Sequence, residues 1–80
     1  MRWNSTSDGP ASVYLGAEAV RAFKCAGWLE DRQRGSHVIL TKIRHHATLS
    51  IPQHRELAPG TLRALIRASG LSVEEFVALL

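Results

Sequence analysis

Apolar residues recur at helical spacing in two parts of the chain. From Ala17 onward they lie three and four positions apart, with charged residues mainly on the other side; the apolar positions are Ala19, Val20, Phe23 and Ala26. In the second part Pro59 suits a first helical turn, and the apolar stripe is Leu62, Leu65 and Ile66. Gly27 and Gly70 follow the two stripes, where a left-handed residue ends many helices. The pattern therefore predicts two amphipathic helices with defined ends.

A third, shorter helix is predicted from Val73 to Leu80. Ser72 and Glu75 have the spacing of a capping box, in which each side chain bonds to the backbone N–H of the other residue. Leu71 and Phe76 occupy the positions of the accompanying hydrophobic staple. We expect this helix to cover part of the core.

Between the first two helices the pattern changes to that of β-strands. Residues 28–34 are short and amphipathic, residues 36–43 carry a β-branched core, and residues 47–51 alternate. In the last of these, Leu49 and Ile51 share one face and Ser50 lies on the other. Gly35 is the natural turn between the first two strands, and Pro52 should close the third because it cannot donate to a β-ladder.

This order, a helix, three strands and two helices, predicts an α+β fold. A single domain of this kind buries its apolar faces by packing helices on one face of a three-stranded antiparallel sheet. The other face of the sheet is then open to a ligand.

The composition of the 80 residues fits one domain. No apolar run is long enough to cross a bilayer, and residues 1–16 lack the apolar segment of a secretory signal. A single cysteine, Cys25, fits a reducing cytosol, and we interpret it as a small core residue. We therefore expect a cytoplasmic protein with a flexible leader at residues 1–15, which are polar and turn-rich, and one domain at residues 16–80.

Positive charge is concentrated in one stretch of the chain. Overall, 10 Lys and Arg against 7 Asp and Glu give a net charge of +3. Between residues 31 and 55 the one acid is Asp31, and the basic residues are Arg32, Arg34, Lys42, Arg44 and Arg55. This balance favours a nucleic-acid backbone as the partner, recognised by phosphates and helix shape because stacking aromatics are missing from the stretch. A solvated strand face would have the same composition.

His37 is the strongest candidate for chemistry. Cleaving a phosphodiester without a metal requires a base, an acid and a cation that holds the phosphoryl charge. Histidine can exchange a proton near neutral pH, and Arg32 and Arg34 precede His37 closely in the chain. Gly35 would let the backbone approach a phosphate, and Ser36 could donate a hydrogen bond. The alternative is a strand histidine that only packs or forms a hydrogen bond.

The other histidines are weaker candidates. His45 and His46 are adjacent and point to opposite faces of an extended chain, so we interpret them as solvated turn residues. His54 lies in the loop after Pro52, where functional groups often occur, although a plain loop residue is the simpler interpretation. One cysteine and four scattered histidines match no zinc-site spacing, so no metal or other cofactor is predicted.

Three segments, taken together, resemble the HicA family of bacterial mRNA interferase toxins. Residues 16–28 (GAEAVRAFKCAGW) are similar to the opening helix of that family, and residues 32–40 (RQRGSHVIL) carry its Gly-Ser-His. Residues 51–66 (IPQHRELAPGTLRALI) and 68–71 (ASGL) are close to its Val-Pro-x-His, Leu-x-x-Gly-Thr-Leu and Ala-Gly-Leu signals. Gly-Ser-His alone is a weak signal, but the ordered combination is specific. The resemblance covers about residues 16–80.

The resemblance implies a double-stranded-RNA-binding-like fold with endoribonuclease activity that inhibits translation and growth. The catalytic histidine of the family corresponds to His37, which would act as base or acid toward a ribose 2′-OH that is the internal nucleophile. A second proton-transfer group is then required: His54, a lysine or water. RNA contacts are expected from Arg32, Arg34, Gly35, Ser36, Lys42, Arg44 and His54.

The resemblance also implies a protein partner, a HicB antitoxin that binds the toxin and covers its active site; the free toxin is expected to be a monomer. The chain departs from the family at residues 43–46, where a Pro-Asp-Gly-like turn is common, and its leader is longer than usual. Two other functions stay open: a non-catalytic RNA-binding module of the same fold, and a protein-interaction or metal-binding domain.

Overall fold

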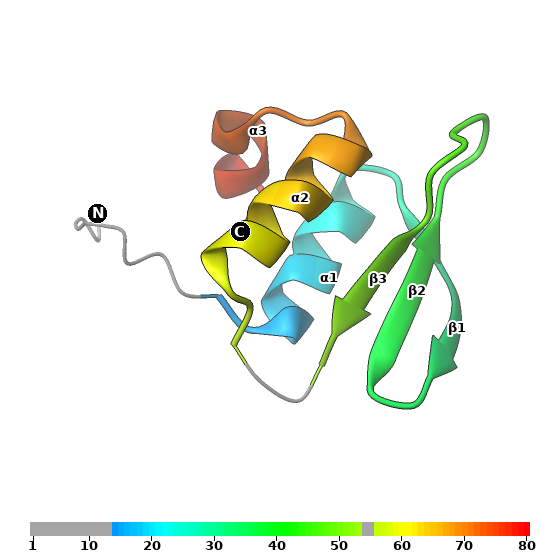
Figure 1. Cartoon of the computed structure of the whole chain (residues 1–80). Coiled ribbons are helices and arrows are strands. Elements are labelled where there is room, and N and C mark those ends of the chain that lie inside the picture. The colour runs from blue at the N-terminus through cyan, green and yellow to red at the C-terminus, as the bar shows by residue number, and fades with distance from the viewer. Residues whose placement is uncertain (1–13, 54–55) are drawn as a thin grey trace.

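One antiparallel sheet with helices on one of its faces makes up the molecule (Figure 1). The computed structural model describes residues 14–53 and 56–80. The sheet has the strand order β1-β2-β3. In chain order the elements are α1 (Gly16–Cys25), β1 (Leu29–Arg34), β2 (His37–Thr41), β3 (Leu49–Pro52), α2 (Pro59–Ser69) and α3 (Val73–Ala78). The predicted α+β fold, which is like that of double-stranded-RNA-binding domains, is confirmed.

The expected leader, residues 1–15, lies outside the described residues except for its last two. Tyr14 packs against the core, with its ring edge-on to Phe76 at 6.3 Å between centroids. Leu15 forms an isolated antiparallel bridge with Glu56 just before α1 begins. Both residues therefore belong to the folded part of the chain.

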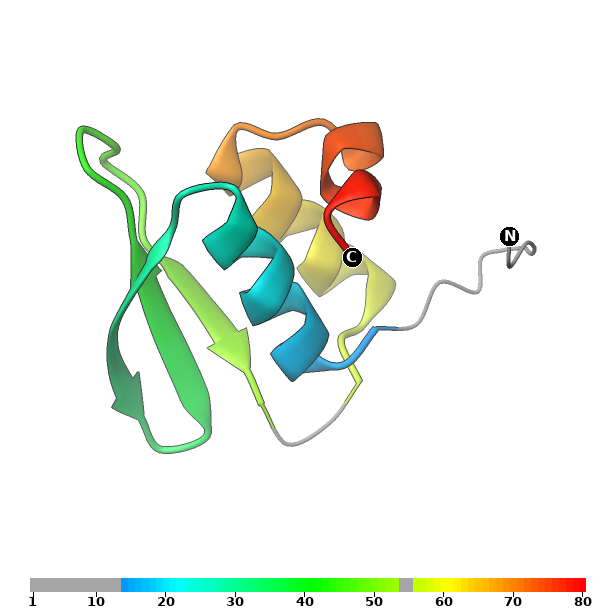
Figure 2. The same ribbon diagram turned by 180° about the vertical axis from the view of Figure 1, so that it is seen from behind.

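Alternation along β2 and β3 separates a buried face of the sheet from an open one. Val38, Leu40, Leu49 and Ile51 are buried and belong to the core cluster that the helices complete. The intervening residues of these strands point the other way, as a pleated strand requires. Figures 1 and 2, which show opposite sides of the molecule, both show this second face without a covering layer. The predicted open face is therefore present.

Helix α1 ends in the backbone motif that Gly27 predicts. Gly27 has a φ of +102°, its N–H donates to the carbonyl of Lys24, and the N–H of Trp28 donates to the carbonyl of Phe23. These two bonds define a Schellman motif, in which the residue after the glycine packs back on the helix. Trp28 is accordingly 1% exposed and shares the core with Phe23. The end of α1 thus places Trp28, the largest of the buried side chains, in the core directly before β1 begins.

The predicted end of α2 and the predicted start of α3 are also confirmed, whereas α3 ends at Ala78, two residues before the predicted Leu80. Gly70 has a φ of +84° directly after α2, and the stripe of Leu62, Leu65 and Ile66 is buried. At α3 the N–H of Glu75 donates to Ser72 Oγ at 3.0 Å and the N–H of Ser72 donates to Glu75 Oε1 at 2.8 Å. Phe76 is buried and Leu71 packs against the same core, as the staple requires.

Two sequence-based expectations about the core are wrong. Cys25 is exposed because it follows the exposed Arg21 by one helical turn and shares its face, not the face of Phe23. The first strand has no buried side: all six residues of β1 are exposed. Both β1 and β3 are edge strands that pair with β2, but α1 and α2 both contact β3 and leave β1 uncovered.

Candidate active site

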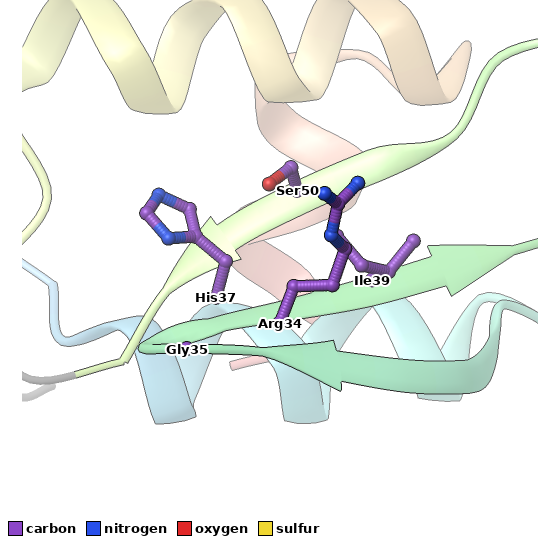
Figure 3. A pocket seen from close by; sticks show the side chains of 5 residues that line it. All are labelled: Arg34, Gly35, His37, Ile39 and Ser50. Carbon is purple, nitrogen blue, oxygen red and sulfur yellow. The ribbon is translucent and has the colours of Figure 1, made fainter.

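The open face of the sheet carries a pocket of about 470 Å³ beside the turn that joins β1 to β2. Its lining residues are Arg34, Gly35, His37, Ile39 and Ser50. In the close-up of Figure 3 the side chains of Arg34, His37 and Ser50 project from three different strands on the same side of the sheet. A cation, an imidazole and a hydroxyl thus line one surface pocket.

The register of the strands brings these residues together. Arg34 pairs with His37 across the β1–β2 ladder, and Ile39 pairs with Ser50 across the β2–β3 ladder. Because residues two apart share a face, His37 and Ile39 both point to the open side, together with their cross-strand partners. Ile39 is 8% exposed although it lies outside the helix-covered core, so it supplies a covered apolar floor between the polar groups.

A two-residue turn holds Arg34 and His37 opposite each other. Gly35 has a φ of +58°, and Ser36 after it has no positive φ, which matches a type II′ hairpin turn with glycine at its first central position. The carbonyl of Ser36 accepts a hydrogen bond at 2.8 Å from the N–H of Gln53, which follows β3. The end of β3 is thereby tied to the turn. Of the Gly-Ser-His sequence, Gly35 is therefore explained by the turn geometry, and Ser36 and His37 are still candidates for chemistry.

Charge near the pocket is dominated by Arg34. Among residues 14–53 and 56–80 the ion pairs are Lys24–Glu30 and Asp31–Arg32, so the guanidinium of Arg34 has no carboxylate partner there. Arg32 pairs across the ladder with Ile39 and so lies on the same open face, but its neighbour Asp31 offsets part of its charge. Arg34 is thus the cation of the described chain that is free to hold an anion beside His37.

Two of the predicted cations lie far from the pocket. Lys42 comes directly after the opposite end of β2, about 16 Å from His37 if the strand rises about 3.3 Å per residue, and Arg44 lies two residues further along, in the loop. His54, another predicted contact, lies outside the described residues, as does Arg55. Strand pairing therefore divides a basic stretch that is continuous in the sequence into two separate regions.

His45 is not a solvated turn residue, contrary to the sequence-based interpretation. Its Nε2 lies 2.9 Å from the carbonyl oxygen of Ala68 at the end of α2, and its ring meets the Trp28 ring edge-on at 4.8 Å between centroids. His46 is exposed, in agreement with that interpretation. Within the described ranges, no three His, Cys, Asp or Glu side chains come together as metal ligands could.

Sequence reasoning missed Ser50 and Ile39 as members of this site. Ser50 was detectable in principle from alternation, because a polar residue between the buried Leu49 and Ile51 must face the open side. Ile39 was not, because its neighbours Val38 and Leu40 are also apolar and the run does not alternate. Alternation does not give the cross-strand register. The pairing of Ser50 with Ile39 is what places Ser50 in the lining of the pocket with His37.

Comparison with known proteins identifies the family of the chain. No helix in the described residues has the length and apolarity needed to cross a membrane. No curated protein matches the chain with significance. The family model described as the HicA toxin of bacterial toxin–antitoxin systems matches residues 16–71, a range that contains the whole sheet, the pocket and the two longer helices. Because this match covers well over half of the chain and includes Gly35, Ser36 and His37, the protein belongs to the HicA family of toxins, whose members act opposite a cognate antitoxin.

Proposed function

We propose that this protein is an endoribonuclease that cleaves mRNA at the open face of its sheet and thereby arrests translation and growth. The observation that carries the proposal is the placement of His37 beside Arg34 in a solvent-accessible pocket. Imidazole is the side chain suited to proton transfer near neutral pH, and an unpaired guanidinium is suited to a phosphate. A proton-transfer group and a cation are both used in phosphodiester cleavage, and this pocket supplies one of each.

In this reaction the ribose 2′-oxygen attacks the neighbouring phosphorus. His37 takes the 2′-OH proton as the new O–P bond forms, and the bond from phosphorus to the 5′-oxygen breaks. The products are a 2′,3′-cyclic phosphate and a 5′-hydroxyl. Arg34 faces the phosphoryl oxygens, where negative charge develops, and Ser50 Oγ and the Gly35–Ser36 turn offer hydrogen-bond donors on either side.

The leaving 5′-oxygen needs a proton from a second group. Of the described residues that line the pocket, His37 carries the one side chain of the type that transfers protons in catalysis near neutral pH. We therefore assign the second transfer to water, which reaches this open surface, or to His54, which lies outside the described residues. If water is the second proton-transfer group, we expect slower turnover than in a nuclease in which two side chains are positioned for acid and base catalysis.

The proposed activity is tested by incubating the purified chain with RNA in the presence of a chelator. Cleavage should continue, because the proposed chemistry uses a histidine and no metal, and the fragments should carry 2′,3′-cyclic phosphate ends. Cleavage that stops with chelator and returns with a divalent ion would contradict this mechanism. Salt-sensitive RNA binding without any cleavage would favour a non-catalytic RNA-binding module instead.

Replacing Arg34 by alanine should lower the cleavage rate by about 10²-fold, the usual cost of removing one donor that stabilises developing charge. It should also reduce the slope of log RNA affinity against log salt by about 0.7, the value for one lost phosphate contact on a single strand. The matched control is Arg63→Ala on the exposed side of α2, which should change neither quantity. Equal losses in both variants would show a general charge effect and no specific role for Arg34.

The cognate antitoxin that family membership implies is proposed to be HicB-like and to cover the same open face. This face presents the pocket together with Leu29, a large apolar residue of β1 that is 55% exposed. Leu29 pairs with Thr41, at the other end of the β1–β2 ladder from Arg34 and His37. A partner that covers the face from Leu29 to the pocket would therefore close the pocket to RNA. Inhibition would then follow from steric exclusion of the substrate.

A further inference from the structure

The loop between β2 and β3, residues 42–48, projects beyond the end of the sheet. Figures 1 and 2 show it from opposite sides as the green segment at the far end of the sheet from the Gly35–Ser36 turn. Its tip is therefore separate from the pocket of His37, at the other end of β2. A nucleotide bound in the pocket therefore does not reach the tip, and a ligand of the tip is a separate group or a more distant part of the same molecule.

The tip has a defined backbone conformation that its sequence does not favour. The N–H of His45 donates to the carbonyl of Lys42 at 3.1 Å, which closes a four-residue turn with Ile43 and Arg44 at its centre. Arg44 has a φ of +65°, the only positive φ of a non-glycine residue among the described residues. A type II turn requires such a φ at its third position, where glycine would be unstrained. Arg44 thus has a strained backbone where glycine would have none. Strained residues of this kind cluster at functional sites, which suggests that the arginine side chain has a role.

The base of the loop is held firmly. His45 bonds to the carbonyl oxygen of Ala68 at 2.9 Å and packs edge-on against Trp28, a residue that is 1% exposed. These contacts tie the loop both to the end of α2 and to the core. Because His45 is adjacent to Arg44 in the chain, its contacts also restrict the tip, so the tip loses little conformational entropy when it binds a ligand.

The tip combines positive charge with an exposed apolar side chain. Arg44 is exposed, Ile43 is 77% exposed, and Lys42 places its Nζ 6.0 Å from the Trp28 ring centroid. No acidic residue occurs between Lys42 and Gln53, and no ion pair of the described residues involves this loop. A strand of RNA fits these features, since it offers phosphates to the cation and sugar or base surface to the apolar side chain.

We propose that the loop tip, Ile43 and Arg44, is a second RNA contact, separate from the cleavage pocket and occupied by a more distant part of the same RNA. This inference rests on the proposed function, because it takes RNA as the ligand of the pocket. Arg44 binds a backbone phosphate, Ile43 packs against the adjoining nucleotide, and His45 positions both. RNA that is long enough to span pocket and loop binds more tightly than RNA that reaches the pocket alone.

The test uses the full chain carrying His37→Ala, so that bound RNA is not cut, and two labelled mixed-sequence oligoribonucleotides of about four and about sixteen nucleotides. Arg44→Gly removes the cation and relieves the strained φ, so the fold is kept. It should weaken binding of the longer RNA about tenfold and leave the shorter RNA unchanged. Arg44→Lys, which keeps the charge, should retain most of the affinity. His45→Ala should also weaken binding of the longer RNA, because it removes the contacts with Ala68 and Trp28 that hold the loop.

Several results would overturn the inference. Unchanged affinity of Arg44→Gly for the longer RNA, or equal losses for both lengths, would remove the second contact while leaving the cleavage pocket in place. Unchanged RNA affinity with weakened binding of the cognate antitoxin would make the loop a protein contact. If the parent chain binds neither RNA and the wild-type chain cuts none, the proposed function fails first and the loop contact fails with it.

Discussion

Replacing His37 by alanine should reduce RNA cleavage by about 10²–10⁴-fold, which is the usual contribution of a positioned acid–base group. The same change should abolish growth arrest when the chain is expressed without antitoxin. The reason lies in the pocket: among its described lining residues, His37 carries the one side chain of the type that transfers protons near neutral pH, so no other described lining residue can take over its role.

The fold should survive this substitution, which makes the result interpretable. His37 is half-buried on the open face of the sheet and lies outside the core cluster. Its backbone pairs with Arg34 and Pro52 whatever side chain it carries. Thermal unfolding should therefore be similar for wild type and variant.

A chemical control is His37→Asn, which keeps a polar side chain of similar size but cannot exchange a proton. It should be as inactive as the alanine variant and should still bind RNA with a salt-dependent affinity. If either folded variant cleaves RNA at the wild-type rate, the role proposed for His37 is wrong.

Replacing Gly16 by alanine should destabilise the protein by about 3 kcal/mol, the upper part of the range for overpacking. A Cβ on Gly16 would lie 1.7 Å from the carbonyl oxygen of Pro52 and 2.8 Å from its carbonyl carbon. Both are backbone atoms, so relief requires α1 to move away from the end of β3. Because Pro52 pairs with His37, the displacement would also disturb the pocket. For a domain of this size the melting temperature should fall by on the order of 10–20 °C.

Gly60→Ala is the matched control for this prediction. Gly60 also lies in the first turn of a helix, but an added Cβ there meets no atom within 4 Å. Alanine at this position should stabilise the protein by about 0.5–1 kcal/mol, because it restricts the unfolded chain without creating a clash. Melting temperatures of the two variants should therefore move in opposite directions. A Gly16→Ala protein as stable as wild type would contradict the close contact between α1 and β3.

Local features of the fold were predictable because each depends on residues a few positions apart. Gly27 and Gly70 end their helices in left-handed conformations, and Ser72 and Glu75 form the capping box. These structures are set by backbone torsions and side-chain reach within one turn. The amphipathic stripes of α1 and α2, by contrast, show which face is apolar but not what lies against it.

Features that depend on neighbours from elsewhere in the chain were not predictable in the same way. The polar residues of β1 fit an exposed strand, but only strand pairing shows that it lies at an edge of the sheet. Nothing local indicates that His45 docks between Trp28 and the end of α2. The basic stretch is likewise divided between the pocket and the β2–β3 loop because a strand of five residues separates its two halves. Charge counted along a sequence takes no account of that distance.

From the sequence alone, the family, the order of elements and the choice of His37 as the candidate for chemistry were already determined, because they rest on motifs and periodicity that survive without coordinates. Only the tertiary structure decided what accompanies His37: cross-strand register brings Arg34 and Ser50 to it and leaves Lys42 and Arg44 at the other end of the sheet. The physical reason is that strand pairing joins residues distant in the chain, and a shift of one position would turn each of these side chains to the opposite face.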